Sequence, residues 1–463
     1  MRRMSTEGLA QARDKMAAGG VHPQAVDVFT HYYQQLESGE TGMISEADVE
    51  PMEAPPKLGE LEVTADEARA ALDATAIIRL NGGLGTSMGM DRAKSLLEVR
   101  DGRTFLDIIA GQVSNLRTAY GARLPLLFMN SFRTRDDTLE ALSAYPDLAV
   151  DGLPLDFLQN REPKLRTDDL TPVKWPADPS LEWCPPGHGD LYTALHVSGV
   201  LQALVERGFR YASVSNSDNL GAVPSAEIAG WFAGSGAPYA AEVCRRTPAD
   251  IKGGYLVVRR SDGRLVLRET AQTPPADVEE ANDITRHRYF HTNNLWFDLF
   301  ALAEAMQRTS GVLGLPLIRN VKTVDPGDAG SPEVVQIESA MGAAVEIFDK
   351  ATAVEVDRSR FLPVKTTNDL LVLRSNVYEI GADCTLHAVG EAPRVDLDGS
   401  YYKLIDDFDR RFAAGAPSLV RADSLTVRGD WTFGADVQVV GAAVLEDAGT
   451  PSRVQDGATV GRG

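Results

Sequence analysis

Short apolar runs alternate with amphipathic stretches along the chain from residue 75 onward. The run Ala76-Ile77-Ile78 is followed by the polar, glycine-rich segment LNGGLGTSMGMDRAK, and such a run bounded by turn residues is typical of a strand. Strands that alternate with helices are typical of βαβ units, so the pattern predicts an α/β protein with parallel strands. The first elements expected are strands at Ile77–Leu80 and Pro125–Met129 and helices at Phe105–Tyr120 and Arg135–Ala144.

The pattern continues with a long helical stretch at Leu191–Arg207 and a strand at Tyr211–Val214. Farther along, the runs Tyr255–Arg260 and Leu265–Arg268 are separated by Ser261-Asp262-Gly263. Two strands joined by a short turn that contains glycine form a β-hairpin. We therefore expect this part of the sheet to contain antiparallel strands.

Changes in pattern divide the chain into three expected parts. Residues 1–74 are polar and helical, with a proline-rich interruption at residues 51–56, which predicts an N-terminal helical extension. Residues 75–385 carry the alternating strands and helices of the α/β domain. Residues 386–463 form a linker and a tail of a different kind.

The tail has a six-residue period. Apolar residues recur at that spacing, and the last two repeat it after a three-residue insertion. A hexapeptide period is typical of a parallel β-helix, in which each apolar residue points into a stacked core. An ordinary run of short strands is the alternative. The residues on this period are Val427, Phe433, Val439, Leu445, Val454 and Val460.

Composition restricts the function. The chain has 463 residues, 43% of them hydrophobic, and a net charge of −20, which makes it a poor partner for nucleic acid. No apolar run is long enough to span a bilayer, and the N-terminus lacks the apolar core of a secretory signal. The three cysteines, Cys184, Cys244 and Cys384, form no CxxC pair. We therefore expect a cytoplasmic protein without nucleic-acid or membrane partners.

The glycine-rich loop after the first strand is a candidate phosphate site. Successive amides from Asn81 to Gly85 can form an anion-binding concavity, and Arg92 and Lys94 follow it. The glycine spacing matches neither the Rossmann fingerprint nor the P-loop. A purely structural loop is the alternative, although its length and trailing cations favour a functional one.

A second candidate is the segment WCPPGHGD at residues 183–190, which leads into the expected helix at Leu191. His188 is bracketed by glycines near a helix N-terminus, where anions are favoured. It is therefore a candidate hydrogen-bond donor to a phosphate or to the edge of a base. Asp190 is expected to cap the helix.

Two further segments contain isolated charged residues. Asp218 follows the strand at Tyr211–Val214, where α/β proteins bind ligands, and one carboxylate beside phosphates suits Mg²⁺; an Asx turn is the alternative. Lys365 follows the apolar sequence FLPV, which favours a defined position over a freely solvated one. Its role cannot be assigned from that segment alone.

Together these segments resemble the eukaryotic-type UTP–glucose-1-phosphate uridylyltransferases, also called UDP-glucose pyrophosphorylases. The resemblance runs in register from about Leu80 to Tyr378, through LNGGLGTSMG, KSLLEVRDGRTFLD, LLFMNSF, PPGHGD, VSNSDNLGA, KGGYLV, HTNNLW and FLPVKTTNDLL. GTSMG distinguishes this group from the related UDP-N-acetylhexosamine pyrophosphorylases, whose loop is more similar to GTRLG.

The resemblance implies a glycosyltransferase-A-like, Rossmann-like nucleotidyltransferase domain followed by a left-handed parallel β-helix. It also implies Mg²⁺-dependent, reversible transfer of UMP from UTP to glucose 1-phosphate, giving UDP-glucose and pyrophosphate. Two alternatives stay open: a uridylyltransferase for N-acetylhexosamine 1-phosphate or for a broader range of sugar 1-phosphates, and a non-catalytic UDP-sugar-binding protein.

Roles for individual residues follow from the same resemblance. Lys94 and Lys365 are the implied catalytic cations, and Asp218 is the implied Mg²⁺ ligand. The implied nucleotide-binding residues are Leu80, Asn81, Gly82, Gly83, Lys94, Gln159, Gly187, Asn216 and Lys365. The implied sugar-phosphate residues are His188, Asn216, Asp218, Gly253, Gly254, Asn293 and Asn294.

The sequence departs from the family pattern at two positions beside the implied site. Cys184 replaces an aromatic residue before Pro-Pro, and Ser217 replaces an apolar residue between Asn216 and Asp218. The tail is also shorter than that of the family, in which it carries subunit contacts in some members. Homo-oligomerisation through the β-helix is therefore an open expectation.

Overall fold

The computed structural model describes residues 2–247, 250 and 253–461. Its centre is a ten-stranded mixed sheet with the strand order β1-β12-β14-β10-β2-β5-β6; β11 pairs with β14 and β17, and β13 pairs with β12. The strands are β1 (Val49–Pro51), β2 (Thr75–Asn81), β5 (Leu126–Asn130), β6 (Asp156–Leu158), β10 (Tyr211–Asn216), β11 (Tyr239–Arg245), β12 (Tyr255–Arg259), β13 (Leu265–Arg268), β14 (Tyr289–Asp298) and β17 (Thr352–Glu355).

The parallel half of this sheet is the predicted one. Strands β10, β2, β5 and β6 lie side by side and are all parallel, whereas β14 runs antiparallel to β10. The expected hairpin is confirmed by the antiparallel pair β12–β13, with Gly263 at a φ of 71° in its turn. Ile77 packs into one hydrophobic core and Ile78 into the other, because alternate residues of a strand face opposite sides of the sheet.

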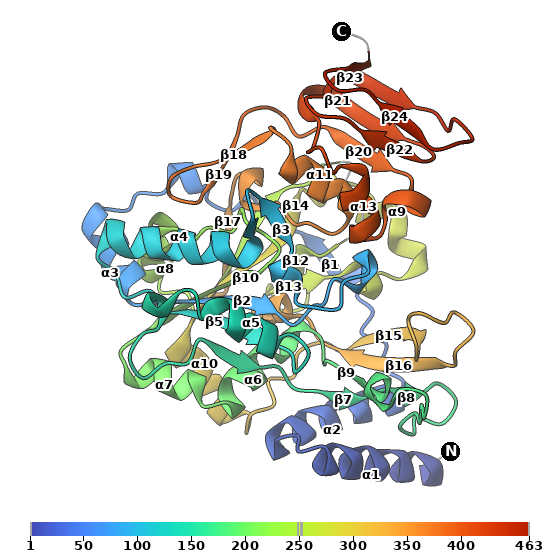
Figure 1. Ribbon diagram of the computed structural model, residues 1–463. Helices are drawn as coiled ribbons and strands as arrows, with labels where there is room; N and C mark the ends of the chain where they lie inside the picture. Colours follow the sequence, from blue (N-terminus) through green and yellow to red (C-terminus); the bar gives the residue numbers. More distant parts are fainter. Residues whose placement is uncertain (1, 248–249, 251–252, 462–463) are drawn as a thin grey trace.

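Helices cover both faces of the sheet (Figure 1). One core contains α3 (Ala65–Asp73), α4 (Phe105–Tyr120) and α8 (Ala226–Ser235). The opposite core contains α2 (Pro23–Ser38), α6 (Leu191–Val197), α7 (Val200–Glu206) and α10 (Leu299–Arg308). The predicted helix at Phe105–Tyr120 is confirmed at both ends, and α5 (Arg135–Leu142) lies where the second helix was expected.

The predicted helix at Leu191–Arg207 is wrong as a single element. Helix α6 ends at Val197 and α7 begins at Val200, with Gly199 between them at a φ of 76°. A residue in the left-handed region ends an α-helix, and glycine adopts that region without strain from a Cβ atom. The apolar period continues across the break because both helices pack into the same core.

The first 74 residues contain more than helices. Besides α1 (Arg2–Ala18), α2 and α3, they include β1, which pairs antiparallel with β12 at the end of the main sheet. Helix α3 packs against α8, and α1 packs against α2 (Figure 1). These residues therefore contribute a strand and a covering helix to the main body.

The C-terminal segment is built from parallel strands. One sheet has the order β20-β21-β23-β25, and β22 pairs with β24. The register places Val427 beside Leu445, Phe433 beside Val454, and Val439 beside Val460, so residues of the six-residue period stack on one another. The strands are β20 (Arg394–Leu397), β21 (Ser418–Val427), β22 (Trp431–Phe433), β23 (Gln438–Leu445), β24 (Ser452–Val454) and β25 (Thr459–Gly461).

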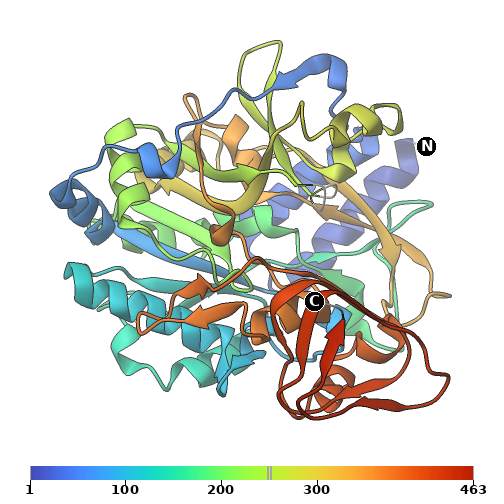
Figure 2. The ribbon, with the colours of Figure 1, turned by 90° about the horizontal axis from the view of Figure 1, so that it is seen from above.

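Figure 2 shows these C-terminal coils as a unit beside the main body, well separated from the N-terminus. The remaining elements are short. They are β3 (Glu98–Arg100), β4 (Arg103–Thr104), β7 (Glu162–Pro163), β8 (Leu165–Arg166), β9 (Trp183–Cys184), α9 (Val278–Asn282), β15 (Ile318–Thr323), β16 (Glu333–Glu338), α11 (Thr367–Arg374), β18 (Tyr378–Ile380), β19 (Leu386–Ala388), α12 (Gly399–Tyr402) and α13 (Ile405–Arg411). None of the helices in the described ranges is long and apolar enough to cross a membrane.

Truncation of Phe433 tests whether the stacked register stabilises the C-terminal coils. Its side chain is 3% exposed, and its ring stacks on Phe412 with centroids 4.7 Å apart. Phe433→Ala is expected to reduce the stability of the coils by about 3–5 kcal/mol, because it removes a buried aromatic ring and leaves a cavity. Hydrogen exchange of residues 418–461 measures this loss. Val444→Ala is the control, since Val444 lies on β23 with 55% of its surface exposed; equal effects would contradict the packing assigned to Phe433.

Candidate active site

The glycine-rich loop begins where β2 ends, at the carboxyl edge of the parallel strands. A Cβ atom on Gly82 would lie 2.7 Å from both polar atoms of the Gln159 side chain, so the loop backbone and this side chain are in direct contact. The carbonyl of Gly83 accepts a hydrogen bond from the backbone N–H of Lys94 at 3.1 Å. The loop thus connects the implied uracil-binding glutamine to the first implied phosphate lysine.

Asn81 supports this loop from inside the protein. Its side chain is 2% exposed, and its Nδ2 donates to Asn130 Oδ1 at 2.8 Å and to Thr138 Oγ1 at 2.9 Å. Ser217, one of the two departures from the family pattern, donates from Oγ to Asn81 Oδ1 at 3.0 Å, and its N–H donates to the Leu80 carbonyl at 3.1 Å. The Asn81 side chain is therefore turned into the interior, and its implied contact with the nucleotide stays a prediction.

Lys94 and Asp218 form the central ion pair of the site. The Lys94 ammonium lies 2.7 Å from Asp218 Oδ2, and the two side chains are 16% and 20% exposed. The ammonium also donates to the carbonyl of Val364, whose own N–H donates to the Asp218 carbonyl at 3.2 Å. Three segments that are far apart in the sequence meet here, and the third carries Lys365 as the next residue.

Lys365 is exposed, and it lies at the start of α11. Its N–H donates to Asp369 Oδ2 at 2.8 Å, within the capping box formed by Thr366 and Asp369. Burial raises the pKa of Glu269, and the nearby positive charge of Lys365 opposes that rise. Glu269 Oε1 would lie 2.7 Å from a Cβ atom on Gly254. Lys365 therefore lies in the same region as Gly254, one of the four residues implied to contact the sugar, which we call the implied sugar wall (Gly253, Gly254, Asn293 and Asn294).

His188 is held in one protonation and tautomeric state. The N–H of Met341 donates to His188 Nδ1 at 2.9 Å, so the neutral ring carries its proton on Nε2. Burial lowers the pKa of His188, which keeps the ring neutral at pH 7. Gly187, at a φ of 77°, and Gly189 lie directly against Ser339. The turn thus presents a fixed N–H donor.

The two asparagines of the implied sugar wall face different ways. Asn293 has a φ of 59°, and its N–H donates to Nδ1 of His291 at 3.1 Å. Burial, with a smaller effect of the nearby His188, lowers the pKa of His291 to about 4. Asn294 is 3% exposed and donates to Glu242, so its side chain belongs to the interior. β14 is irregular at this point, with Asn293 in the left-handed region and a register shift against β11. The assignment of both asparagines to the sugar wall stays a prediction.

Gly253 and Asn216 complete the implied residues. Gly253 has a φ of 132°, and a Cβ atom there would lie 2.5 Å from the ring of Phe290. The Phe290 ring packs in turn against Phe361, with centroids 5.2 Å apart. Asn216 is the last residue of β10, so it lies at the same sheet edge as Leu80, its partner on β2.

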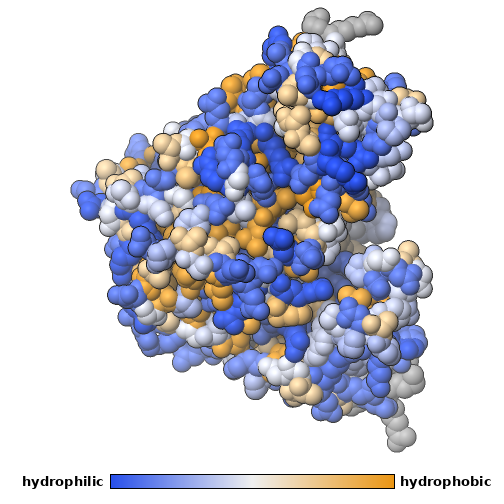
Figure 3. All heavy atoms as spheres, viewed as in Figure 1, coloured by the Kyte–Doolittle hydropathy of each residue, from blue (hydrophilic) through white to orange (hydrophobic). Residues whose placement is uncertain are grey.

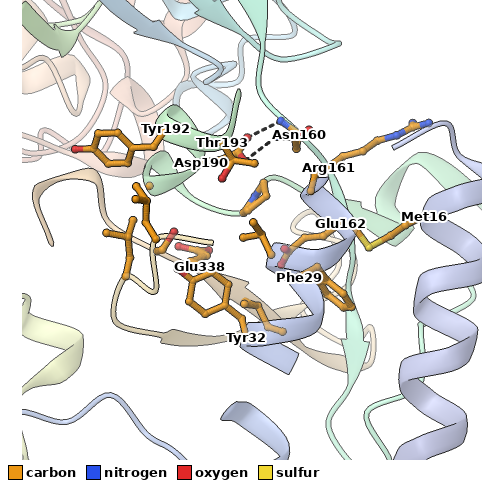
Figure 4. Close-up of a pocket in the computed structure, with 18 residues that line it drawn as sticks. Met16, Phe29, Tyr32, Asn160, Arg161, Glu162, Asp190, Tyr192, Thr193 and Glu338 are labelled. Carbon is orange, nitrogen blue, oxygen red and sulfur yellow. Dashed lines mark hydrogen bonds between the residues drawn. The ribbon is translucent and has the colours of Figure 1, made fainter. Parts of the chain in front are cut away.

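A closed acidic pocket lies behind the His188 turn (Figure 4). The Asp190 carboxylate accepts hydrogen bonds from the backbone N–H of Asn160 at 2.5 Å and from its side chain at 2.8 Å. Asp190 is the N-cap residue of α6, as expected, but its side chain makes no capping hydrogen bond because it binds Asn160 instead. Burial raises the pKa of Asp190 to about 7, and it raises the pKa of Glu162 with help from Asp190 and Glu338. Asn160 follows Gln159 directly, so this pocket fixes the backbone beside it.

The other departure, Cys184, is 4% exposed and lies on β9 beside this pocket. Its Sγ lies 3.7 Å from the carbonyl oxygen of Glu162, on the paired strand β7. The thiol occupies less space than the aromatic ring that it replaces. The neighbouring residue, Trp183, is aromatic, and its indole contacts two cations, Lys15 and Arg161. Cys184 is therefore a buried packing residue.

The donor set at Asp218 fits Mg²⁺ held partly by substrate. Asp218 is partly exposed at the strand edge, and its Oδ2 pairs with Lys94. Within the described residues no group of three or more His, Cys, Asp or Glu side chains could hold a metal ion without other ligands. A single carboxylate completed by phosphate oxygens and water is a normal Mg²⁺ site.

The surface view shows a hollow on one face of the molecule. In Figure 3 the outline is indented between the C-terminal coils and the β15–β16 region, and apolar side chains are visible within the indentation. A pocket beside the glycine-rich loop is lined by Gly82 of the loop, by Gln159 and by Pro185 of the WCPPGHGD segment, among others. A cavity with apolar walls and a few polar groups is typical of ligand sites.

The fold is that of an α/β protein with a glycine-rich loop at the carboxyl edge of its parallel strands, and the loop, two lysines and a neutral histidine are groups suited to bind phosphate esters. The model of the family UTP–glucose-1-phosphate uridylyltransferase matches residues 26–440. The chain belongs to this family.

Relatives and solved structures agree over nearly the whole chain. A UTP–glucose-1-phosphate uridylyltransferase from Astragalus penduliflorus is 39% identical over 413 residues, which covers 88% of this chain and 84% of the relative. A probable one from Schizosaccharomyces pombe is 35% identical and covers 94% and 85%. A UDP-glucose phosphorylase from Trypanosoma brucei has a TM-score of 0.91 at 42% identity, covering 98% of each chain. A variant UDP-glucose pyrophosphorylase from Leishmania major, in complex with UDP-glucose, has a TM-score of 0.90 at 41% identity with the same coverage.

Two groups at the site were not found from the sequence. Glu269 is a buried acid beside Gly254 and Lys365, and Glu242 pairs with Arg360 behind β14. Neither acid lies in one of the sequence segments that carry the resemblance to the family. Their importance comes from contacts between distant segments, for which a single sequence carries no signal.

Replacement of Gly187 tests the contact that positions His188. An alanine Cβ would lie 2.6 Å from the Ser339 carbonyl oxygen and would also require a left-handed φ. Gly187→Ala is expected to lower both the melting temperature and the activity, because backbone atoms must move beside His188. Gly199→Ala is the control, since Gly199 has a similar φ of 76° but no atom within 4 Å, and its strain alone amounts to about 1–2 kcal/mol. Equal losses in both variants would contradict the role given to the Ser339 contact.

Proposed function

We propose that the protein transfers UMP from UTP to glucose 1-phosphate. A phosphate oxygen of glucose 1-phosphate attacks the α-phosphorus of UTP in line, the bond between the α-phosphorus and its bridging oxygen to the β-phosphate breaks, and pyrophosphate leaves with that electron pair. One phosphoanhydride replaces another, so the reaction is freely reversible. Family membership supports the reaction, and the observation that carries the mechanism is the convergence of Lys94, Asp218 and the Lys365 segment at the glycine loop.

The barrier that the protein lowers is repulsion between two anions. The attacking phosphate is already ionised at neutral pH, so the reaction needs no general base. Fixed positive charge and correct positioning together contribute most of the catalysis in phosphoryl transfer. In this proposal Lys94 and the loop amides bind the triphosphate, and Lys365 neutralises the charge that develops as the two phosphates approach.

His188 and the loop select and orient the substrates. The Nε2–H of the neutral His188 ring donates to the phosphate of glucose 1-phosphate, and this geometry needs no change of protonation. Gln159, in contact with Gly82, reads the edge of the uracil base. The sugar lies against Gly253, Gly254 and Asn293. Mg²⁺, when bound by Asp218 and the phosphates, neutralises negative charge on the triphosphate.

We further propose that the stacked C-terminal coils form a short left-handed β-helix that follows a glycosyltransferase-A-like domain. The parallel register and the buried Val427, Phe433 and Val439 support this assignment. Homo-oligomerisation through this unit and a cytoplasmic location belong to the same proposal. Sedimentation of the full chain and of a form ending before Ser418 tests the oligomerisation.

The reaction is tested directly by incubating the purified protein with UTP, Mg²⁺ and single sugar 1-phosphates. Pyrophosphate release is expected with glucose 1-phosphate and to a much smaller extent with N-acetylglucosamine 1-phosphate. Equal release with both sugars would favour the broader uridylyltransferase. Tight binding of UDP-glucose without any pyrophosphate release would favour a sugar-nucleotide-binding protein.

Lys365→Ala is expected to lower kcat by about 10²–10³-fold, the loss typical of one electrostatic group in a preorganised site. The melting temperature is expected to stay unchanged, because the side chain is exposed and the helix cap uses its backbone N–H. Steady-state kinetics and thermal unfolding measure the two effects. Lys57→Ala, which removes an exposed lysine elsewhere, is the control, and an active Lys365→Ala variant would remove this lysine from the mechanism.

Asp218→Asn is expected to raise the Mg²⁺ concentration for half-maximal activity by more than about tenfold, since a neutral amide is a weak ligand for a hard cation. A Mg²⁺ titration of the initial rate at saturating UTP measures the shift. Lys94→Met separates the two roles of Asp218, because it removes the ion pair and keeps the carboxylate. An unchanged Mg²⁺ dependence in Asp218→Asn would refute the ligand assignment.

A further inference from the structure

Glu242 is a buried carboxylate with an unusually complete set of partners. It lies on β11 with 1% of its surface exposed. Arg360 binds it in a bidentate manner: Nε donates to Oε2 and Nη2 donates to Oε1, each at 2.7 Å. Trp296 Nε1 donates to it at 2.9 Å and Asn294 Nδ2 at 3.1 Å. These bonds, led by the charge of Arg360, lower the pKa of Glu242 against the effect of burial, so the pair is ionised.

Arg360 is fixed through its backbone as well. Its carbonyl accepts from Asn219 Nδ2 at 3.1 Å and from Asn294 Nδ2 at 3.2 Å. Its Nη1 donates to the carbonyl of Val223 at 2.9 Å. Both ends of this residue are therefore bound, and all three partner segments belong to the rigid body of the sheet and the loop that follows β10.

The segment after Arg360 runs directly to the site. The N–H of Leu362 donates to Asn219 Oδ1 at 2.8 Å, and the N–H of Val364 donates to the Asp218 carbonyl at 3.2 Å. Lys94 binds the Val364 carbonyl. Residues 361–364 thus follow the short 3-10 helix Arg358–Arg360 and lie beside Asp218 and Asn219, directly before Lys365.

We propose that the Arg360–Glu242 pair is a positioning element for uridylyl transfer, which sets the location of Lys365 by anchoring residues 360–364 to β11 and to Asn219. The proposal rests on the function proposed above. Neither residue touches the substrate region, because Glu242 is enclosed by Arg360, Trp296 and Asn294. A planar guanidinium is required, since only arginine binds both carboxylate oxygens and the Val223 carbonyl at once.

Arg79 explains why the arginine is the better residue to replace. Arg79 is fully buried and donates to Ser215 Oγ and to the Ala222 carbonyl, and the charge of Glu242 partly offsets the lowering of its pKa by burial and by Arg360. Glu242→Gln would leave two buried guanidinium groups without a carboxylate, which destabilises the fold itself. Arg360→Lys keeps the positive charge and loses only the fork geometry.

The test compares kcat and KM in Arg360→Lys and wild type, with melting temperatures measured alongside. Arg360→Lys is expected to lower kcat by about 10–100-fold, the loss that a misplacement of about 1 Å produces, with both KM values within about threefold. Arg245→Lys is the matched control. Arg245 lies on β11, the strand of Glu242, and it also pairs with a glutamate, Glu355, but its side chain is largely exposed. Its kinetics are expected to match those of wild type.

A double-mutant cycle separates positioning from general stability. In a Lys365→Ala background, Arg360→Lys is expected to change kcat by less than about twofold, because the group that it positions is already absent. The same fold-change in both backgrounds, or an unchanged kcat in the single variant, would overturn the proposal. If the lysine variant does not fold, Asn219→Ala is the second substitution, because it removes the side chain that binds the Arg360 carbonyl and the Leu362 N–H and leaves the buried ion pair intact. An inactive wild-type protein would instead overturn the proposed function.

Discussion

The Lys94–Asp218 ion pair is the interaction on which the site depends. It joins the segment that follows the glycine loop to the end of β10, and Lys94 then binds the Val364 carbonyl and brings in the segment that carries Lys365. Because both side chains are mostly shielded from water, the pair is screened less than a surface pair would be. The cationic site can therefore be assembled before its anionic substrates bind, because the Asp218 carboxylate balances the charge of the Lys94 ammonium until a triphosphate binds.

This local arrangement matters more in a protein with a net charge of −20. Long-range electrostatics repel a triphosphate, so attraction must come from groups within a few ångströms of it. Backbone amides of the glycine loop, two lysines and the Nε2–H of His188 are suited to this, because each acts at contact distance. The buried acids behind the site, Asp190 and Glu162, carry less negative charge near neutral pH than exposed acids would, because burial raises their pKa values.

The elements that local chemistry determines were predictable from the sequence. Helix α4 was predicted at both ends, since Thr104 and Asp107 form a capping box at its start and Gly121 ends it at a φ of 63°. The break at Gly199 was missed, because the apolar period runs unchanged from α6 to α7. Asn294 was assigned to the site through the family resemblance, which gave no sign that its side chain is buried and donates to Glu242. The Arg360–Glu242 pair could not be predicted, because its geometry exists only after β11 and the segment near Lys365 are brought together.

The hydrogen bond from Met341 to His188 has a consequence for how the reaction responds to acidity. A ring whose Nδ1 accepts a hydrogen bond from a backbone N–H, and whose pKa is lowered by burial, is not suited to carry protons between reactants. In the proposed role, its hydrogen bond to a phosphate would stay unchanged across the range in which a phosphate monoester itself gains a proton, at a pKa of about 6. Any sensitivity of the sugar-phosphate step to mild acid would then originate in the acceptor molecule and leave the histidine unaltered.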